Sequence, residues 1–282
     1  MHLSREEFIN WPHKAITLIG MSGVGKTMLS NTLPKSSWFH FSGDYRIGTR
    51  YLNEAILDNI KRQAMEVGFL RDLLRSDSIY IANNISVDNL EPISTFLGKI
   101  GNESKGGLPL EEFTRRQRMH REAENQAMID VAAFIKKAQD IYGYEHFVND
   151  SGGSVCELNS QDALDAIGNN TVVIYLRADD EIEQRIIERS VTSPKPMYYQ
   201  EAFLDRKLAE YLSLEGLADT SEITPDHFAQ WIFPELVVHR RPLYQGIADK
   251  YGYTLDVKDA EGIETEEELL GLIGDIIGAG NS

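Results

Sequence analysis

The chain has 282 residues with 28 basic and 44 acidic side chains, which gives a formal net charge of −16 at pH 7. Such a charge repels the phosphate backbone of nucleic acids and argues against general nucleic-acid binding. No segment approaches the ~18 apolar residues that a membrane span needs, and the first residues lack the apolar core of a secretory signal. The single cysteine, Cys156, cannot form an intrachain disulfide, so we expect a cytoplasmic protein; its oligomeric state stays open.

The first part of the chain alternates between apolar strands and amphipathic helices. Residues 15–20, AITLIG, are typical of a short buried strand, and residues 26–34 predict a helix that stops at Pro34. Residues 37–44 predict a second strand. Apolar residues at helical spacing predict a helix over 48–77 with a break at Gly68, and 78–87 fits a strand or an extended segment.

The middle of the chain begins with a polar stretch, NESKGGLP, at 102–109. Its two glycines and its proline favour a linker. A long charged helix is predicted over 109–142, with Ala, Met and Ile at a spacing of three to four. Residues 146–150, HFVND, then predict a strand, followed by the tight turn SGGS.

The last part repeats the alternation. Residues 171–178 predict a strand, and 179–190 predict a helix with acidic residues in its first turn. Residues 190–199 predict a loop, and 200–235 a polar, partly helical segment. A helix, a strand and a final helix are predicted at 242–252, 253–257 and 265–277. Strands that alternate with helices predict an α/β fold with a doubly wound parallel sheet.

One glycine-rich motif dominates the sequence. Gly20-x-x-x-x-Gly25-Lys26-Thr27 has the spacing of a phosphate loop, in which glycines let backbone N–H groups surround an anion. Lys26 is then expected to reach the β- and γ-phosphates of a nucleotide, and the Thr27 hydroxyl to bind Mg²⁺. A strand–turn–helix with chance glycines is the alternative, but the preceding strand and following helix favour nucleotide binding. The predicted cofactor-binding residues are Gly20, Ser22, Gly23, Val24, Gly25, Lys26, Thr27 and Met28.

Two acidic residues follow predicted strands at the carboxyl edge of the sheet, where ligands bind in such folds. Asp44 is suited to contact a substrate hydroxyl, to act as a base, or to bind Mg²⁺ through water; alternatively it caps a helix. Asp150 is suited to be the Mg²⁺-associated acid at a strand end. Gly152 and Gly153 permit a close backbone approach to a ligand, although a plain β-turn would favour the same residues.

Two pairs of arginines are further candidates. Arg185 and Arg189 are four residues apart on one predicted helix, which suits a lid over the transferred phosphate. Surface ion pairs with Asp180 and Glu181 are the alternative. Arg240 and the residue after it precede a proline, and in so acidic a chain they indicate an acidic ligand. The alternative is that they only flank the start of a helix and bind nothing.

These motifs resemble the shikimate-kinase-like branch of phosphate-loop small-molecule kinases. The stretch GMSGVGKT is similar to that family's loop, and FSGDYRIGTRYLNEAI to its second strand, acidic motif and helix. The stretch DSGGSVCELNSQDALDAIGNNTVVIYLRADDE is similar to its glycine-rich turn, helix and strand, and RRPLYQGIADKYGYTLDV to its last helix and strand. The order matches from end to end, so the chain is predicted to be one domain, 1–282, with helical insertions at 60–145 and 190–235.

The resemblance implies roles for single residues. Lys26 and Thr27 would bind ATP and Mg²⁺, with Asp150 as a second acid at the metal and Asp44 at the acceptor hydroxyl. Arg189 would act at the lid. Other residues would bind substrate or adenine: Arg46, Gly152, Gly153 and Arg240 for the acceptor, and Arg185 and 257–261 near the adenine.

The chain also departs from that family. The family's Asp-x-Asp motif is Ser42-Gly43-Asp44 here, and the third glycine of its turn is Ser154. The short lid is replaced by RSVTSPKPMYY and a long insertion. These changes fall where the acceptor should be chosen, so shikimate itself is not expected as the acceptor.

Three functions remain open from the sequence. The first is ATP-dependent transfer of a phosphoryl group to a hydroxyl of a small-molecule acceptor. The second is a nucleoside monophosphate kinase, which shares the loop and the arginine lid. The third is a regulatory ATPase whose helix at 109–142 binds a protein partner. This function stays open because a fold does not determine a function.

Overall fold

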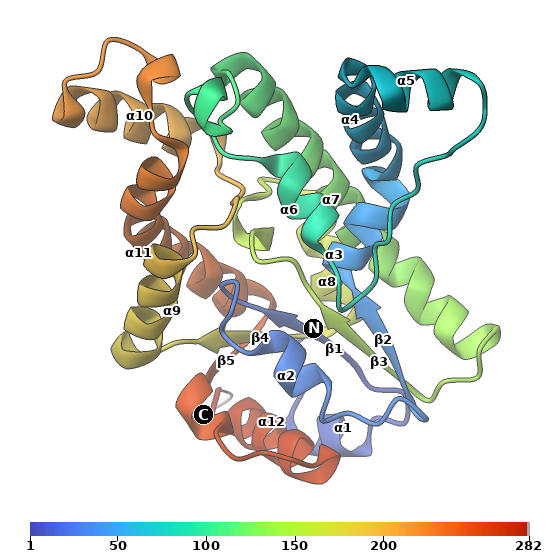
Figure 1. Ribbon diagram of the computed structural model, residues 1–282. Helices are drawn as coiled ribbons and strands as arrows, with labels where there is room; N and C mark the ends of the chain where they lie inside the picture. The colour runs from blue at the N-terminus through green and yellow to red at the C-terminus, as the bar shows by residue number, and fades with distance from the viewer. Residues whose placement is uncertain (281–282) are drawn as a thin grey trace.

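The computed structural model describes residues 1–280, and its centre is one sheet of five parallel strands (Figure 1). The strands lie in the order β2-β3-β1-β4-β5. Their bounds are β1 Ala15–Ile19, β2 Trp38–Ser42, β3 His146–Asp150, β4 Val172–Arg177 and β5 Gly252–Asp256. All five predicted strands are therefore confirmed, and the carboxyl ends of β1, β2 and β3 meet at one edge of the sheet.

Helices cover both faces of the sheet, as Figure 1 shows. On one face lie α1 Arg5–Asn10, α2 Lys26–Ser30 and α12 Glu266–Gly280. On the other lie α7 Leu110–Asp140, α8 Gln161–Asn170 and the C-terminal half of α11 Pro225–Tyr251. Every residue of β1 is buried, as are the first five residues of β4, because these central strands pack against helices on both sides. The predicted doubly wound α/β fold is confirmed.

The remaining helices lie in the segments between these strands. They are α3 Gly43–Arg46, α4 Asn53–Glu66, α5 Gly68–Arg75, α6 Glu91–Leu97, α9 Asp180–Thr192 and α10 Glu201–Glu215. The predicted break at Gly68 is confirmed, because it separates α4 from α5. Among the helices of residues 1–280, none combines the length and the apolar content that a membrane crossing requires.

The structure corrects several sequence-based boundaries. α2 ends at Ser30 rather than at Pro34, and for 78–87 the structure contains the extended segment rather than the strand. The segment 102–109 is a closed turn rather than a linker, because the amide of Gly101 donates to the carbonyl of Leu108 at 3.0 Å.

α11 is the largest correction. A helix start was predicted at Pro242, but the helix begins at Pro225 and runs through both Pro234 and Pro242. A proline inside a helix removes one backbone hydrogen bond and costs about 3 kcal/mol. Burial of the apolar side of α11 offsets this cost, since side chains such as Ile232 and Leu236 are fully buried.

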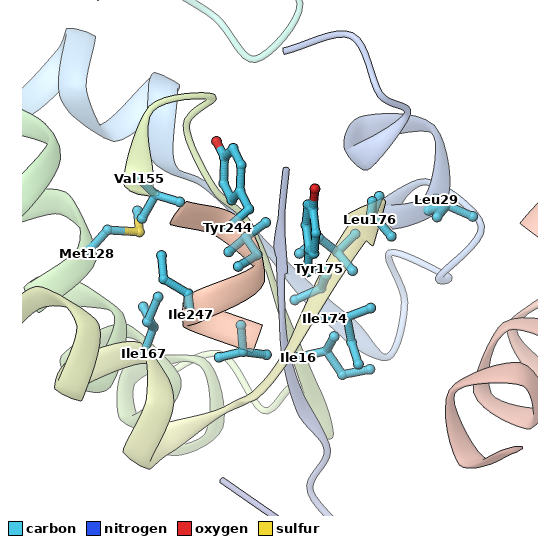
Figure 2. Packing of buried hydrophobic residues seen from close by; sticks show 14 of the residues in the cluster. Ile16, Leu29, Met128, Val155, Ile167, Ile174, Tyr175, Leu176, Tyr244 and Ile247 are labelled. Atoms are coloured by element: carbon cyan, nitrogen blue, oxygen red, sulfur yellow. The ribbon is translucent and has the colours of Figure 1, made fainter. Parts of the chain in front are cut away.

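The buried side chains form two clusters. The larger surrounds the sheet, and Figure 2 shows part of it. There the rings of Tyr175 and Tyr244 stack with their centroids 5.4 Å apart, which fixes α11 against β4 (Figure 2). The smaller cluster joins α10, the first half of α11 and the start of α7 through residues such as Phe113, Phe203 and Phe228. The segment 190–235 thus has apolar packing of its own.

Candidate active site

The phosphate loop connects β1 to α2 and takes the conformation that its glycines permit. Gly23 has φ 85° and Gly25 has φ 108°, in the region that side chains disfavour. A Cβ at Gly23 would also lie 1.9 Å from Nη2 of Arg189. The backbone therefore favours glycine at both positions, and at Gly23 the guanidinium of Arg189 also occupies the space of a side chain.

Lys26 lies at the start of α2 with its side chain almost fully buried. Its Nζ donates hydrogen bonds to the carbonyls of Gly20, at 2.8 Å, and Met21, at 3.1 Å. Burial lowers the pKa of Lys26, and the nearby carboxylates of Asp150 and Asp44 oppose this shift. The ammonium group is thus held against the loop, where a phosphate group would be its partner.

Thr27 and Asp150 are the predicted metal ligands, and the structure brings them together. The Thr27 hydroxyl donates to Oδ2 of Asp150 at 2.5 Å. Burial raises the pKa of Asp150, while Lys26 opposes the shift. Hydroxyl and carboxylate oxygens are the hard donors that Mg²⁺ prefers, with water and phosphate completing its shell. Because residues 1–280 contain no cluster of three or more His, Cys, Asp and Glu side chains placed for a metal, such a shell would depend on the nucleotide.

Asp44 lies in the first turn of α3, at the carboxyl end of β2. The cap of this helix is Ser42, whose hydroxyl accepts from the amide of Tyr45 at 3.3 Å. The alternative that Asp44 is the helix cap is therefore wrong. Burial raises the pKa of Asp44 to about 6, an effect that Lys26 opposes and Asp150 reinforces.

We call the space between these residues the acceptor cavity. It has a volume of about 220 Å³. It is lined by residues of the phosphate loop, the ends of β2 and β3, and the segment before α6: Ser22, Gly23, Gly25, Lys26, Thr27, Met28, Ser42, Asp44, Val87, Leu90, Asp150, Ser151 and Gly153. Four side chains that the sequence predicted in catalytic or metal-binding roles thus line this one cavity: Lys26, Thr27, Asp44 and Asp150.

The turn after β3 packs tightly between the loop and the acids. A Cβ at Gly152 would lie 2.3 Å from Oε1 of Glu124 and 3.1 Å from Oδ1 of Asp44. A Cβ at Gly153 would lie 3.1 Å from the backbone nitrogen of Ser22. The glycines therefore permit close packing against protein atoms, and their predicted approach to a ligand stays a prediction.

Glu124 was missed by the sequence analysis. It lies on α7 with its side chain completely buried, and its Oε2 accepts a hydrogen bond from the Ser154 hydroxyl at 2.5 Å. Its Oε1 has no hydrogen-bond partner. Burial raises the pKa of Glu124 to about 7, with the charge of Asp44 as a smaller contribution in the same direction. The available signal was its position on the helical stripe that also contains Phe113, Ala127 and Val131.

A second cavity, which we call the nucleotide cavity, adjoins the first and has a volume of about 320 Å³. The two share Gly23, Gly25 and Met28. The remaining lining residues come from α2, α9 and the segment after β5: Val24, Leu29, Ile182, Arg185, Ile186, Arg189, Val257, Ala260 and Glu261. The structure thus brings both lid arginines and part of 257–261 to the phosphate loop.

Neither Arg185 nor Arg189 forms an ion pair within residues 1–280. The alternative that they pair with Asp180 and Glu181 is therefore not what the structure contains. Two cationic side chains without acidic partners face a cavity beside a phosphate loop. This arrangement suits a polyanionic ligand.

Two other predicted substrate ligands lie elsewhere. Arg46 pairs with Asp130 at 2.7 Å and packs over the ring of Phe134, with 4.9 Å to the ring centroid. Arg240 has no exposed surface, and its Nε donates to Glu157 at 2.7 Å. In this structure each guanidinium joins parts of the protein, and the substrate role of both arginines stays a prediction.

Comparison with known proteins finds matches among solved structures only. No protein-family model and no curated protein matches the chain. A solved structure described as shikimate kinase from Bacteroides thetaiotaomicron aligns over 95% of this chain and 99% of its own, with 12% identity and a TM-score of 0.43. The assignment of a phosphate-loop α/β fold rests on the chain's own strand order and loop.

Proposed function

We propose that this protein is an ATP-dependent phosphotransferase that acts on a hydroxyl group of a small-molecule acceptor other than shikimate. One observation carries the proposal. Lys26, Thr27, Asp44 and Asp150 line one cavity, and that cavity adjoins a second one that contains two unpaired arginines. A phosphate loop, a metal-binding pair of oxygens and an acid with a raised pKa are the parts that phosphoryl transfer to a hydroxyl requires.

In this proposal the loop amides and Lys26 bind the β- and γ-phosphates of ATP. Thr27 and Asp150 would hold Mg²⁺, which neutralises charge on the phosphates when bound. The acceptor oxygen attacks the γ-phosphorus, the bond to the ADP oxygen breaks, and the hydroxyl proton moves to Asp44. Arg189, beside Gly23, offsets the charge that spreads over the transferring group.

Replacing Lys26 tests the proposal. In Lys26→Ala, phosphoryl transfer should fall by about 10²–10³ or more, because a preorganised cation at the phosphates is lost. Lys35→Ala, which removes an exposed lysine, should transfer at the normal rate. The measurement is the formation of labelled product from γ-labelled ATP. Transfer by Lys26→Ala at nearly the normal rate would refute the phosphotransferase assignment.

The same assay separates the other two candidates. A nucleoside monophosphate kinase would label nucleoside monophosphates in preference to other hydroxyl compounds. A regulatory ATPase would release labelled phosphate slowly and label no acceptor, whichever compounds are supplied.

A further inference from the structure

Arg240 and Arg46, which the resemblance placed at the acceptor, are both paired with acids inside the protein. The three nitrogens of the Arg240 guanidinium donate to Glu157, to the carbonyl of Gly153 at 2.8 Å and to the carbonyl of Tyr198 at 2.8 Å. Arg46 is paired with Asp130. Neither side chain is available to bind a carboxylate or a phosphate group of an acceptor.

The acceptor cavity has an acidic wall. Asp44 and Asp150 line it, and Lys26 is its single cationic lining residue. That ammonium is held at the loop carbonyls, where the phosphates of ATP would engage it. The other side chains on the wall include the hydroxyls of Ser42 and Ser151. With Asp150 at Mg²⁺ in the proposed function, an anionic acceptor would therefore meet the carboxylate of Asp44 and the bound triphosphate together.

A third acid lies directly behind this wall. A Cβ placed on Gly152 would lie 2.3 Å from Oε1 of Glu124 and 3.1 Å from Oδ1 of Asp44, so the two carboxyl groups approach the same point. This Oε1 is buried and has no hydrogen-bond partner. Burial raises the pKa values of both carboxyl groups, although Lys26 opposes the shift at Asp44 and Arg240 opposes it at Glu124. A further positive charge beside Asp44 would stabilise the ionised forms of these carboxyl groups.

We propose that the acceptor is a small hydroxyl compound that also carries a positively charged amine, of the amino-alcohol or amino-sugar class. The hydroxyl lies at Asp44, and the neighbouring carboxyl groups of Asp44 and the buried Glu124 favour an ammonium group over an acidic one. The inference rests on the proposed phosphotransferase function and narrows its substrate. The volume of about 220 Å³ lies below the ~300 Å³ at which pockets for drug-sized ligands begin, which fits a compound of this class.

One cavity beside the acceptor cavity favours an acceptor with a negative charge. Lys195 lines a third cavity of about 250 Å³, together with Arg189 and the hydroxyls of Ser190 and Ser193. This cavity shares Ser22 with the acceptor cavity and is lined by neither Asp44 nor Asp150. An acceptor with an acidic group at Lys195 is thus the competing outcome, and the experiment includes it.

The test separates acceptors by charge. A metabolite extract is divided by ion exchange into cationic, neutral and anionic fractions, and each is incubated with the protein, Mg²⁺ and γ-labelled ATP. We expect labelled product from the cationic fraction at about ten times the rate of the other fractions, as close charge complementarity implies. Faster labelling from the neutral or anionic fraction overturns this inference but leaves the phosphotransferase function intact. Labelling of no acceptor in any fraction contradicts the phosphotransferase function itself.

A defined set of acceptors and one variant make the test sharper. Glucosamine, glucose and glucuronate share a ring and differ in charge, so the apparent KM should increase in that order. Lys195→Gln should leave the rate with the cationic fraction unchanged. A rate that falls several-fold in Lys195→Gln would show that an acidic group of the acceptor is bound there, and would overturn the inference.

Discussion

At the scale of single residues, the site contains carboxyl groups whose pKa values are raised by burial. Asp44 is the clearest case, because burial raises its pKa to about 6 although Lys26 is close. A base with a pKa near the working pH accepts a proton readily and is still ionised in most molecules. Ser42 caps α3, so the carboxyl group of Asp44 is not used as the helix cap.

Asp44→Asn should reduce transfer by about 10²–10⁴ and leave the affinity for a non-hydrolysable ATP analogue unchanged, since a general base is lost and the loop is kept. In the unaltered protein, kcat/KM should fall as the pH drops below about 6, because protonated Asp44 cannot accept a proton. Steady-state rates and analogue titrations measure both effects. Asp58→Asn, an exposed site on α4, is the control. Weakened analogue binding with normal turnover would exclude the acceptor role of Asp44.

At the scale of elements, α7 and α11 bring distant residues to the turn after β3. α7 supplies Glu124, and α11 supplies Tyr244, whose hydroxyl donates to the carbonyl of Gly153 at 2.8 Å. Because α11 passes through Pro242 without ending, Arg240 reaches the same carbonyl from one turn earlier. Both helices therefore position the glycine turn against the phosphate loop.

The buried acid of α7 should make stability depend on pH. The pKa of Glu124 is raised from 4.5 to about 7 on folding, so its contribution to stability is full below pH 4.5 and is lost as the pH rises through 7. Glu124→Gln cannot ionise. The free energy of unfolding of Glu124→Gln minus that of the unaltered protein should therefore be greater at pH 8 than at pH 5, by on the order of 3 kcal/mol.

Urea unfolding of both proteins at pH 5 and pH 8 measures this difference. Glu122→Gln, which removes an exposed acid from the same helix, should show no such change. A stability difference for Glu124→Gln that is the same at both pH values would contradict the raised pKa.

At the scale of the whole molecule, charge is unevenly placed. The chain carries a net charge of −16, yet Arg185 and Arg189 face the nucleotide cavity without acidic partners among residues 1–280. A local cationic site in an acidic protein attracts a polyanion at short range, although the overall field opposes it. This contrast fits a small, strongly charged ligand such as MgATP better than an extended polyanion.

The sequence was sufficient to predict the parts of the fold that depend on local pattern. The apolar runs of β1 and β4 and the spacing of the phosphate loop required no tertiary information. The pairing of Arg240 with Glu157 joins residues 83 positions apart, and no local pattern contains it. The burial of Glu124 likewise depends on α7 packing against the sheet, where tertiary contacts override the usual preference of a carboxylate for water.

Nucleotide binding at the loop of Gly20–Thr27 can be measured by thermal unfolding with a non-hydrolysable ATP analogue and Mg²⁺. Bound ligand should raise the Tm of the unaltered protein. Gly23→Val places a side chain at φ 85° and against Arg189, so its Tm should not respond to the analogue. The two proteins should otherwise share a folded far-ultraviolet circular dichroism spectrum. An equal rise in Tm in Gly23→Val, or no rise in the unaltered protein, would show that this loop is not a nucleotide site.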